Sequence, residues 1–86
     1  MDLQERLEAL LAVAERLGIQ VRREPLGGQG GGLCTLRGRK ILFVDSEADA
    51  ETRYETALSA LGPLEAVHNH YLRPELREDL ERYRPT

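Results

Sequence analysis

The segment Val67-His68-Asn69-His70-Tyr71 is the one place in this sequence where candidate metal ligands of the imidazole type lie close together. His68 and His70 are separated by a single residue. On a strand they would point to the same face, as a two-histidine metal edge requires; on a helix they would diverge by about 200°. Zinc needs three or four ligands, and no spacing fixes Cys34 or Glu65 as the third. A metal site at His68 and His70 is therefore an alternative hypothesis, and we expect no cofactor.

Cys34 is also the only thiol that could act as a nucleophile, and it lies between Leu33 and Thr35 in an apolar segment. A nucleophilic cysteine needs a neighbouring histidine or helix N-terminus to form its thiolate, and no pattern brings one to it. The preferred interpretation is a small buried core residue. Paired carboxylates such as Asp45 and Glu47 are typical of solvated helix faces, and no Ser/His/Asp order is present. We therefore expect a protein that is not an enzyme.

A second candidate chemistry is anion binding by clustered basic residues. Residues 19–44 carry a net charge of +4, whereas the rest of the chain carries −7. A basic sheet surface can neutralise phosphates without reading bases. The aromatic residues that could stack on single strands are few and are mostly predicted to be buried: Phe43, Tyr54, Tyr71 and Tyr83. Weak nucleic-acid or anion binding is thus an alternative function, and its candidate residues are Arg22, Arg23, Arg37, Arg39 and Lys40.

A glycine-rich run at residues 27–32 could also wrap an anion with bare backbone N–H groups. A phosphate-binding loop, however, needs Gly-Lys-Ser/Thr followed by a helix, and here a strand is predicted to follow. The run is therefore interpreted as a hairpin loop.

These side chains must be positioned by a β-hairpin at residues 31–45. Two β-prone runs, 33–36 and 41–44, are separated by a turn that contains Gly38. The second run is continuously apolar, which predicts a central strand covered on both faces. Residues 19–23 alternate apolar and polar, which predicts a further strand that ends at Pro25.

Apolar residues at helical spacing occur before and after the predicted strands. Residues 2–17 carry a leucine stripe, with Asp2 as N-cap and Gly18 as the stop. The stripe could form a dimer seam, but packing on the sheet is preferred. A second helix is expected to be capped by Asp49, alone or with Ser46, and to end at Gly62. Residues 64–72 could be a short helix or a short strand, and a last helix begins at Pro74.

The predicted fold class is α+β, in a single two-layer domain over residues 1–86. It has an N-terminal helix, a three-stranded antiparallel sheet and two further helices on one face. No stretch approaches the ~20 apolar residues of a membrane span, the N-terminus lacks signal-peptide order, and a single cysteine is typical of a reducing compartment. We expect a cytoplasmic protein. Eleven arginines to one lysine indicate a heat-adapted source or a GC-rich genome.

Residues 37–62, RGRKILFVDSEADAETRYETALSALG, resemble the core of small zinc-peptidase domains associated with repressor and toxin–antitoxin cleavage. In those domains a Gly-Arg-x-Ile-x-Phe-Val strand precedes a helix bearing His-Glu-x-x-His. The resemblance places Ser59, Ala60 and Pro63 at the positions of the ligands and the general base. None of these can bind zinc or move a proton, so the resemblance implies a degenerate scaffold.

More broadly, three segments resemble a family of small bacterial proteins that lends no known activity: Gly32-Leu33-Cys34, Arg37-Gly38-Arg39 and Arg73-Pro74-Glu75-Leu76. A chain of this length buries only about 60–65% of its unfolded surface, and subunit contacts often supplement so thin a core. The leading hypothesis is therefore a non-catalytic protein that acts through protein–protein interaction, as a homodimer or other homo-oligomer.

Overall fold

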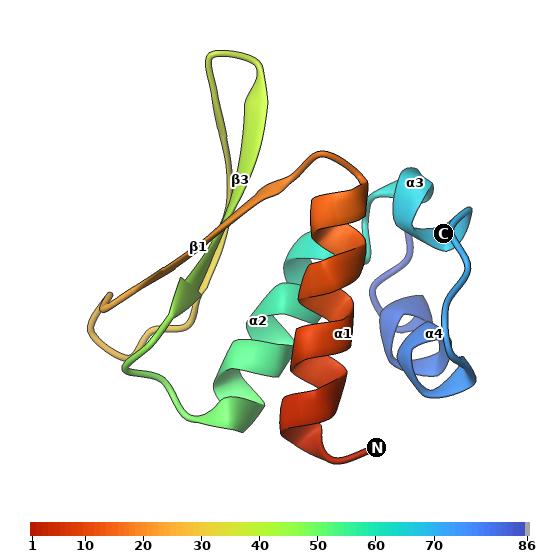
Figure 1. Ribbon diagram of the computed structural model, residues 1–86, viewed down its shortest axis with the longest axis horizontal. Coiled ribbons are helices and arrows are strands. Elements are labelled where there is room, and N and C mark those ends of the chain that lie inside the picture. The colour runs from red at the N-terminus through yellow and green to blue at the C-terminus, as the bar shows by residue number, and fades with distance from the viewer. Residues whose placement is uncertain (86) are drawn as a thin grey trace.

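The computed structural model describes residues 1–85, which form one sheet with helices packed against it. In Figure 1, α1 and α2 lie between the sheet and α4. The α+β fold class expected from the sequence is confirmed. The elements in chain order are α1 (Leu3–Arg16), β1 (Gln20–Glu24), β2 (Gly31–Leu36), β3 (Arg39–Asp45), α2 (Ala50–Leu61), α3 (Glu65–His68) and α4 (Pro74–Glu81).

The sheet is mixed, so the prediction of an antiparallel meander is wrong. Its strand order is β1-β3-β2. β2 pairs antiparallel with β3, with Cys34 opposite Ile41, whereas β1 pairs parallel with β3, with Arg22 opposite Phe43. The most apolar strand takes the centre, as predicted, and the two less apolar strands take its sides. The glycine-rich run therefore carries the chain from one edge of the sheet to the other and is not a hairpin loop.

The helices cover one face of the sheet. Leu42 and Val44 of β3 belong to the main core, together with the partly buried Leu33 of β2. Because side chains alternate along a strand, Phe43 points to the opposite face, where it is only half-buried. On that face Ile41 is buried, at 6% exposed, but within residues 1–85 no helix packs there, and the prediction that this strand is covered on both faces is wrong for Phe43. We call this the open face of the sheet.

The leucine stripe of α1 is used inside the monomer. Asp2 caps the helix by accepting a hydrogen bond from the N–H of Glu5 at 2.8 Å, and Gly18 ends it with a φ of 84°. The preferred interpretation, packing on the sheet, is confirmed for β1, and the helix packs against α2 as well. Leu3, at the start of the stripe, stays exposed. The buried residues of α1 are Leu7, Leu10, Leu11, Val13 and Ala14.

The remaining helices are attached by caps and by a polar network. Asp49 caps α2 by accepting from the N–H of Thr52 at 2.7 Å. Asp79 of α4 accepts from Arg6 of α1 at 2.9 Å and from the Tyr54 hydroxyl of α2 at 2.6 Å. Burial and the hydrogen bond to Asp79 raise the pKa of Tyr54. One carboxylate therefore joins three helices.

Two glycines allow the close approach of the crossing loop to the rest of the fold. A Cβ on Gly31, whose φ is 94°, would overlap the carbonyl oxygen of Phe43. A Cβ on Gly30 would overlap the hydroxyl of Thr56 in α2. In contrast, Gly27 has a similar φ of 87° but faces open space.

This contrast gives a matched pair of variants. Gly27→Ala should lower the free energy of unfolding by about 1–2 kcal/mol, which is the cost of a positive φ for an L-residue. Gly31→Ala adds a clash with the backbone of the central strand and should cost about 3 kcal/mol or more. Chemical denaturation of both variants measures the difference, and equal losses would contradict the close packing of Gly31 on β3.

Candidate functional site

The tip of the β2–β3 hairpin is the most prominent charged feature of the structure. It projects well beyond the helices (Figure 1). Arg37 and Gly38 have φ values of 51° and 77°, as a two-residue type I′ turn requires. Arg37, Arg39 and Lys40 are exposed, and in residues 1–85 none of them forms an ion pair with an acidic side chain. The tip is therefore a small, unneutralised basic site.

The other two predicted anion-binding residues do not join this tip. Arg22 pairs with Glu24 at 2.6 Å and lies over the ring of Phe43, 5.7 Å from its centroid, on the open face. Arg23 points the other way, to Glu8 of α1, with nitrogen–oxygen distances of 2.8 and 3.0 Å. The five basic residues predicted as one surface are thus divided between two faces and the tip, and two of them are already paired.

Cys34 is exposed, so its interpretation as a buried core residue is wrong. The reason is the alternation of β2: Leu33 packs towards the helices, and its neighbour Cys34 therefore lies on the open face. It shares that face with Ile41 and Phe43 of β3 and with Leu36, whose side chain is 57% exposed.

The structure does not bring the histidines together as metal ligands. His68 ends α3 and is buried, with Nε2 2.7 Å from the carbonyl oxygen of Gly62. Its Nδ1 lies 3.7 Å from Glu81. His70 follows the helix and is only half-buried. Among residues 1–85, no group of three or more His, Cys, Asp or Glu side chains could hold a metal ion.

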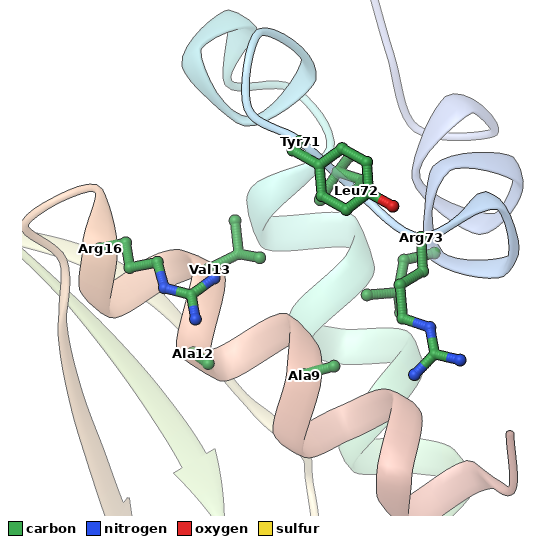
Figure 2. A pocket seen from close by; sticks show the side chains of 8 residues that line it. Ala9, Ala12, Val13, Arg16, Tyr71, Leu72 and Arg73 are labelled. Atoms are coloured by element: carbon green, nitrogen blue, oxygen red, sulfur yellow. The ribbon is translucent and has the colours of Figure 1, made fainter.

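A shallow groove runs between α1 and the start of α4 (Figure 2). Its volume is about 170 Å³, below the roughly 300–1,000 Å³ of most small-molecule sites. Figure 2 shows Tyr71 on one wall and Arg16 and Arg73 towards its ends. The lining residues are Ala9, Ala12, Val13, Arg16, Tyr71, Leu72, Arg73 and Leu76, which include no thiol, imidazole or carboxylate. Tyr71 is therefore the one lining side chain of a type that serves in general acid–base catalysis.

Asp45 fixes the glycine loop at the end of the sheet opposite the tip. Its carboxylate is fully buried and accepts the backbone N–H groups of Leu26 at 2.8 Å, Glu47 at 2.9 Å and Gly30 at 3.2 Å. Burial raises the pKa of Asp45, but these donors outweigh burial and hold it below its ordinary value. Nearby, Glu47 accepts from the N–H of Gly27 at 2.8 Å. The loop is therefore held by anions of its own chain.

The outer edge of β2 is a further candidate site. Within residues 1–85, β2 pairs with β3 alone. The N–H of Asp45 donates to the carbonyl of Gly30 at 3.4 Å. Because hydrogen-bonded pairs alternate along an antiparallel ladder, Cys34 and Leu36 direct their backbone groups to β3. Leu33 and Thr35 direct theirs outward, where a partner strand could bind them.

Comparison with known proteins found no matching family model, no matching curated protein and no matching solved structure. The resemblances to the zinc-peptidase scaffold and to the small bacterial family stay predictions. In the part of the chain that the structure describes, no helix has the length and apolar character to cross a membrane.

Sequence reasoning missed both the free edge and the role of Asp45. It interpreted Asp45 as a solvated carboxylate paired with Glu47, which is wrong because Asp45 is fully buried. The sequence did contain a signal for the role of Asp45. An aspartate that directly follows a buried strand can supply acceptors to the unpaired N–H groups of a glycine run elsewhere in the chain.

The role of Asp45 can be tested by pH. The pKa of Asp45 is lower in the folded than in the unfolded chain. Its contribution to the free energy of unfolding is therefore fully present above the unfolded-state pKa and is lost as the pH falls through the folded-state pKa. Asp45→Asn should therefore be less stable than the wild type at pH 7, and the gap should narrow on acidification. Denaturation at several pH values measures it. A gap that is constant with pH would contradict this assignment.

Proposed function

We propose that the protein is a non-catalytic interaction domain that binds by strand addition at the free edge of β2, with self-association as the simplest use of that edge. One observation supports this most directly: the edge strand, GGLCTL, has no charged residue and no proline. Natural proteins usually protect exposed edges with charges, prolines or covering elements because unpaired strands attract other strands. An unprotected edge is therefore a candidate binding site.

The opposite edge of the same sheet provides the comparison. β1 has the sequence QVRRE and is followed by Pro25. Its charged side chains and the proline are the features that discourage strand addition. The contrast between the two edges of one sheet favours β2 as the binding element.

The absence of catalysis in this proposal is supported by what the reactive side chains do. The Nε2 of His68 is engaged by the carbonyl of Gly62 inside the fold. Cys34 stands on the open face of the sheet, and the groove along α1 offers Tyr71 alone as an acid–base group. The side chains with reactive chemistry thus sit at separate places.

The edge can be blocked without disturbing the ladder to β3. Since the N–H of Thr35 faces outward, Thr35→Pro removes a donor that only a partner would use, and Thr35→Val keeps it. A peptide copying residues 31–36, with serine for Cys34, serves as a probe strand. We expect wild type and Thr35→Val to bind the peptide and to protect the amide of Leu33 from hydrogen exchange, and Thr35→Pro to bind at least tenfold more weakly.

Exchange of the Leu33 and Thr35 amides, followed by NMR up to about 1 mM peptide, is the measurement; 1 mM corresponds to about −4 kcal/mol of binding. Unprotected amides throughout, with wild type and Thr35→Pro alike, would contradict strand addition.

The hairpin tip favours a second candidate function, weak binding of nucleic acid or another polyanion. Its three basic residues are exposed and have no acidic partner in residues 1–85. They lie on a hairpin that extends beyond the helices (Figure 1). Phe43 is half-buried beneath Arg22, so stacking of bases on the sheet would require Arg22 to move. The expected binding is therefore electrostatic and independent of sequence.

Salt dependence tests this candidate. Three phosphate contacts on a single strand predict a slope of about −2 in a plot of log K against log salt concentration. Fluorescence anisotropy with a labelled oligonucleotide should give this slope for wild type and for Arg23→Glu, whose site already pairs with Glu8. The triple change Arg37→Glu, Arg39→Glu and Lys40→Glu should abolish binding. Equal binding by the two variants would exclude the tip.

A further inference from the structure

The free edge of β2 has a symmetry that identifies a partner. When two identical strands pair about a two-fold axis, residue i of one strand faces residue j of the other, and j faces i in turn. The axis therefore passes through a single residue position of the strand. The outward backbone groups of Leu33 and Thr35 become mutual partners only if the strands run antiparallel and Cys34 lies on the axis. Leu33 of each copy then pairs with Thr35 of the other, which gives about four hydrogen bonds.

The neighbouring two-fold registers are excluded by the backbone. A register centred on Leu33 would pair Thr35 with Gly31, whose φ of 94° takes it out of the extended conformation. A register centred on Thr35 would pair Leu33 with Arg37, which lies in the turn with a φ of 51°. The Cys34-centred register uses extended residues alone.

Charge favours the same antiparallel arrangement. The tip of the hairpin carries Arg37, Arg39 and Lys40. The other end of the sheet lies about 20 Å away along a seven-residue strand. We call it the acidic end, and its acidic side chains that are not fully buried are Glu24, Glu47, Asp49 and Glu51. Antiparallel pairing at β2 brings the basic tip of each copy to the acidic end of the other, whereas parallel pairing would place tip against tip.

The position of the helices leaves room for this pairing. α2 approaches β2 at its beginning, where Gly30 lies against Thr52 and Thr56, while the hairpin extends past the helices at its tip (Figure 1). Antiparallel copies therefore place their helical layers towards opposite ends of the shared strand pair.

We propose that the partner of the β2 edge is the β2 of a second copy of this chain, paired antiparallel about a two-fold axis at Cys34, with each basic tip against the other copy's acidic end. This inference rests on the proposed function, because it names the partner of the same edge. In this dimer both β2 edges are paired, so no β2 edge remains for a third copy. The charged β1 strands form the two outer edges of a continuous six-stranded sheet.

The native cysteine tests the register. Cα atoms of a non-hydrogen-bonded antiparallel pair lie about 4.5 Å apart, within the range that a disulfide spans. Under mild oxidation by copper–phenanthroline, the wild type should form a covalent dimer at least tenfold faster than the control, Cys34→Ser with Leu36→Cys. The control thiol is also exposed, but its counterpart would lie about four residues away along the partner strand, roughly 13 Å. Equal rates would overturn the register.

Charge reversal tests the orientation. Arg37→Glu with Arg39→Glu should weaken dimerisation at least tenfold, measured by light scattering at low salt. Arg16→Glu with Arg73→Glu changes the net charge equally, at exposed residues beside the α1 groove, and should leave dimerisation unchanged. Equal effects of the two double variants would overturn the tip-to-acidic-end contact.

These results separate the two proposals. If the probe peptide protects the Leu33 amide but the full chain scatters as one chain, strand addition stands and pairing of copies is wrong. Self-association without the cysteine cross-link overturns this register alone. If neither the peptide nor a second copy changes the edge amides, both proposals are wrong.

Discussion

The buried carboxylate of Asp45 is the interaction on which the arrangement of the sheet depends. A chain that passes from one edge of a sheet to the other must cross its end, and here it does so with glycines whose N–H groups have few partners in regular structure. Asp45 accepts from Leu26, Gly30 and Glu47, and so ties both ends of the crossing to the end of β3. A buried anion is tolerated because several N–H donors replace its water.

That crossing decides which surfaces the protein exposes. With β1 and β2 on opposite sides of β3, each has an unpaired outer edge, and the two edges differ in composition. With helices on one face alone, the side chains of Phe43 and Cys34 remain accessible on the other. Leu7, Leu10 and Leu11 of α1 are buried within the fold, whereas the outer edge of β2 is unpaired within residues 1–85.

Local features of the fold were predictable because short-range physics sets them. The caps at Asp2 and Asp49, the stop at Gly18 and the start at Pro74 each depend on residues within one helical turn. The turn at Gly38 and the central place of Ile41–Val44 were also readable. The strand that pairs with β1 could not be predicted, because a five-residue alternating strand can pair equally well with β2 or with β3.

The errors at the candidate site have the same origin. Cys34 lies in a strand of otherwise uncharged residues, and its exposure depends on which face of the sheet α1 and α2 cover, which composition does not encode. Arg22 and Arg23 looked like one basic patch, yet adjacent strand residues point to opposite faces. Phe43 meets one of them and Glu8 the other. The histidine pair was equally ambiguous, and the structure places His68 at the end of α3 and His70 beyond it.

The parallel pairing of β1 with β3 also bears on the order in which the molecule assembles. The type I′ turn joins β2 and β3 across two residues, so this hairpin closes with little loss of chain entropy. β1 must wait for β3, and its alignment of Gln20 with Ile41 closes a loop of about twenty residues. We therefore expect a nucleus built from the C-terminal two strands, to which the N-terminal helix and its strand are added late.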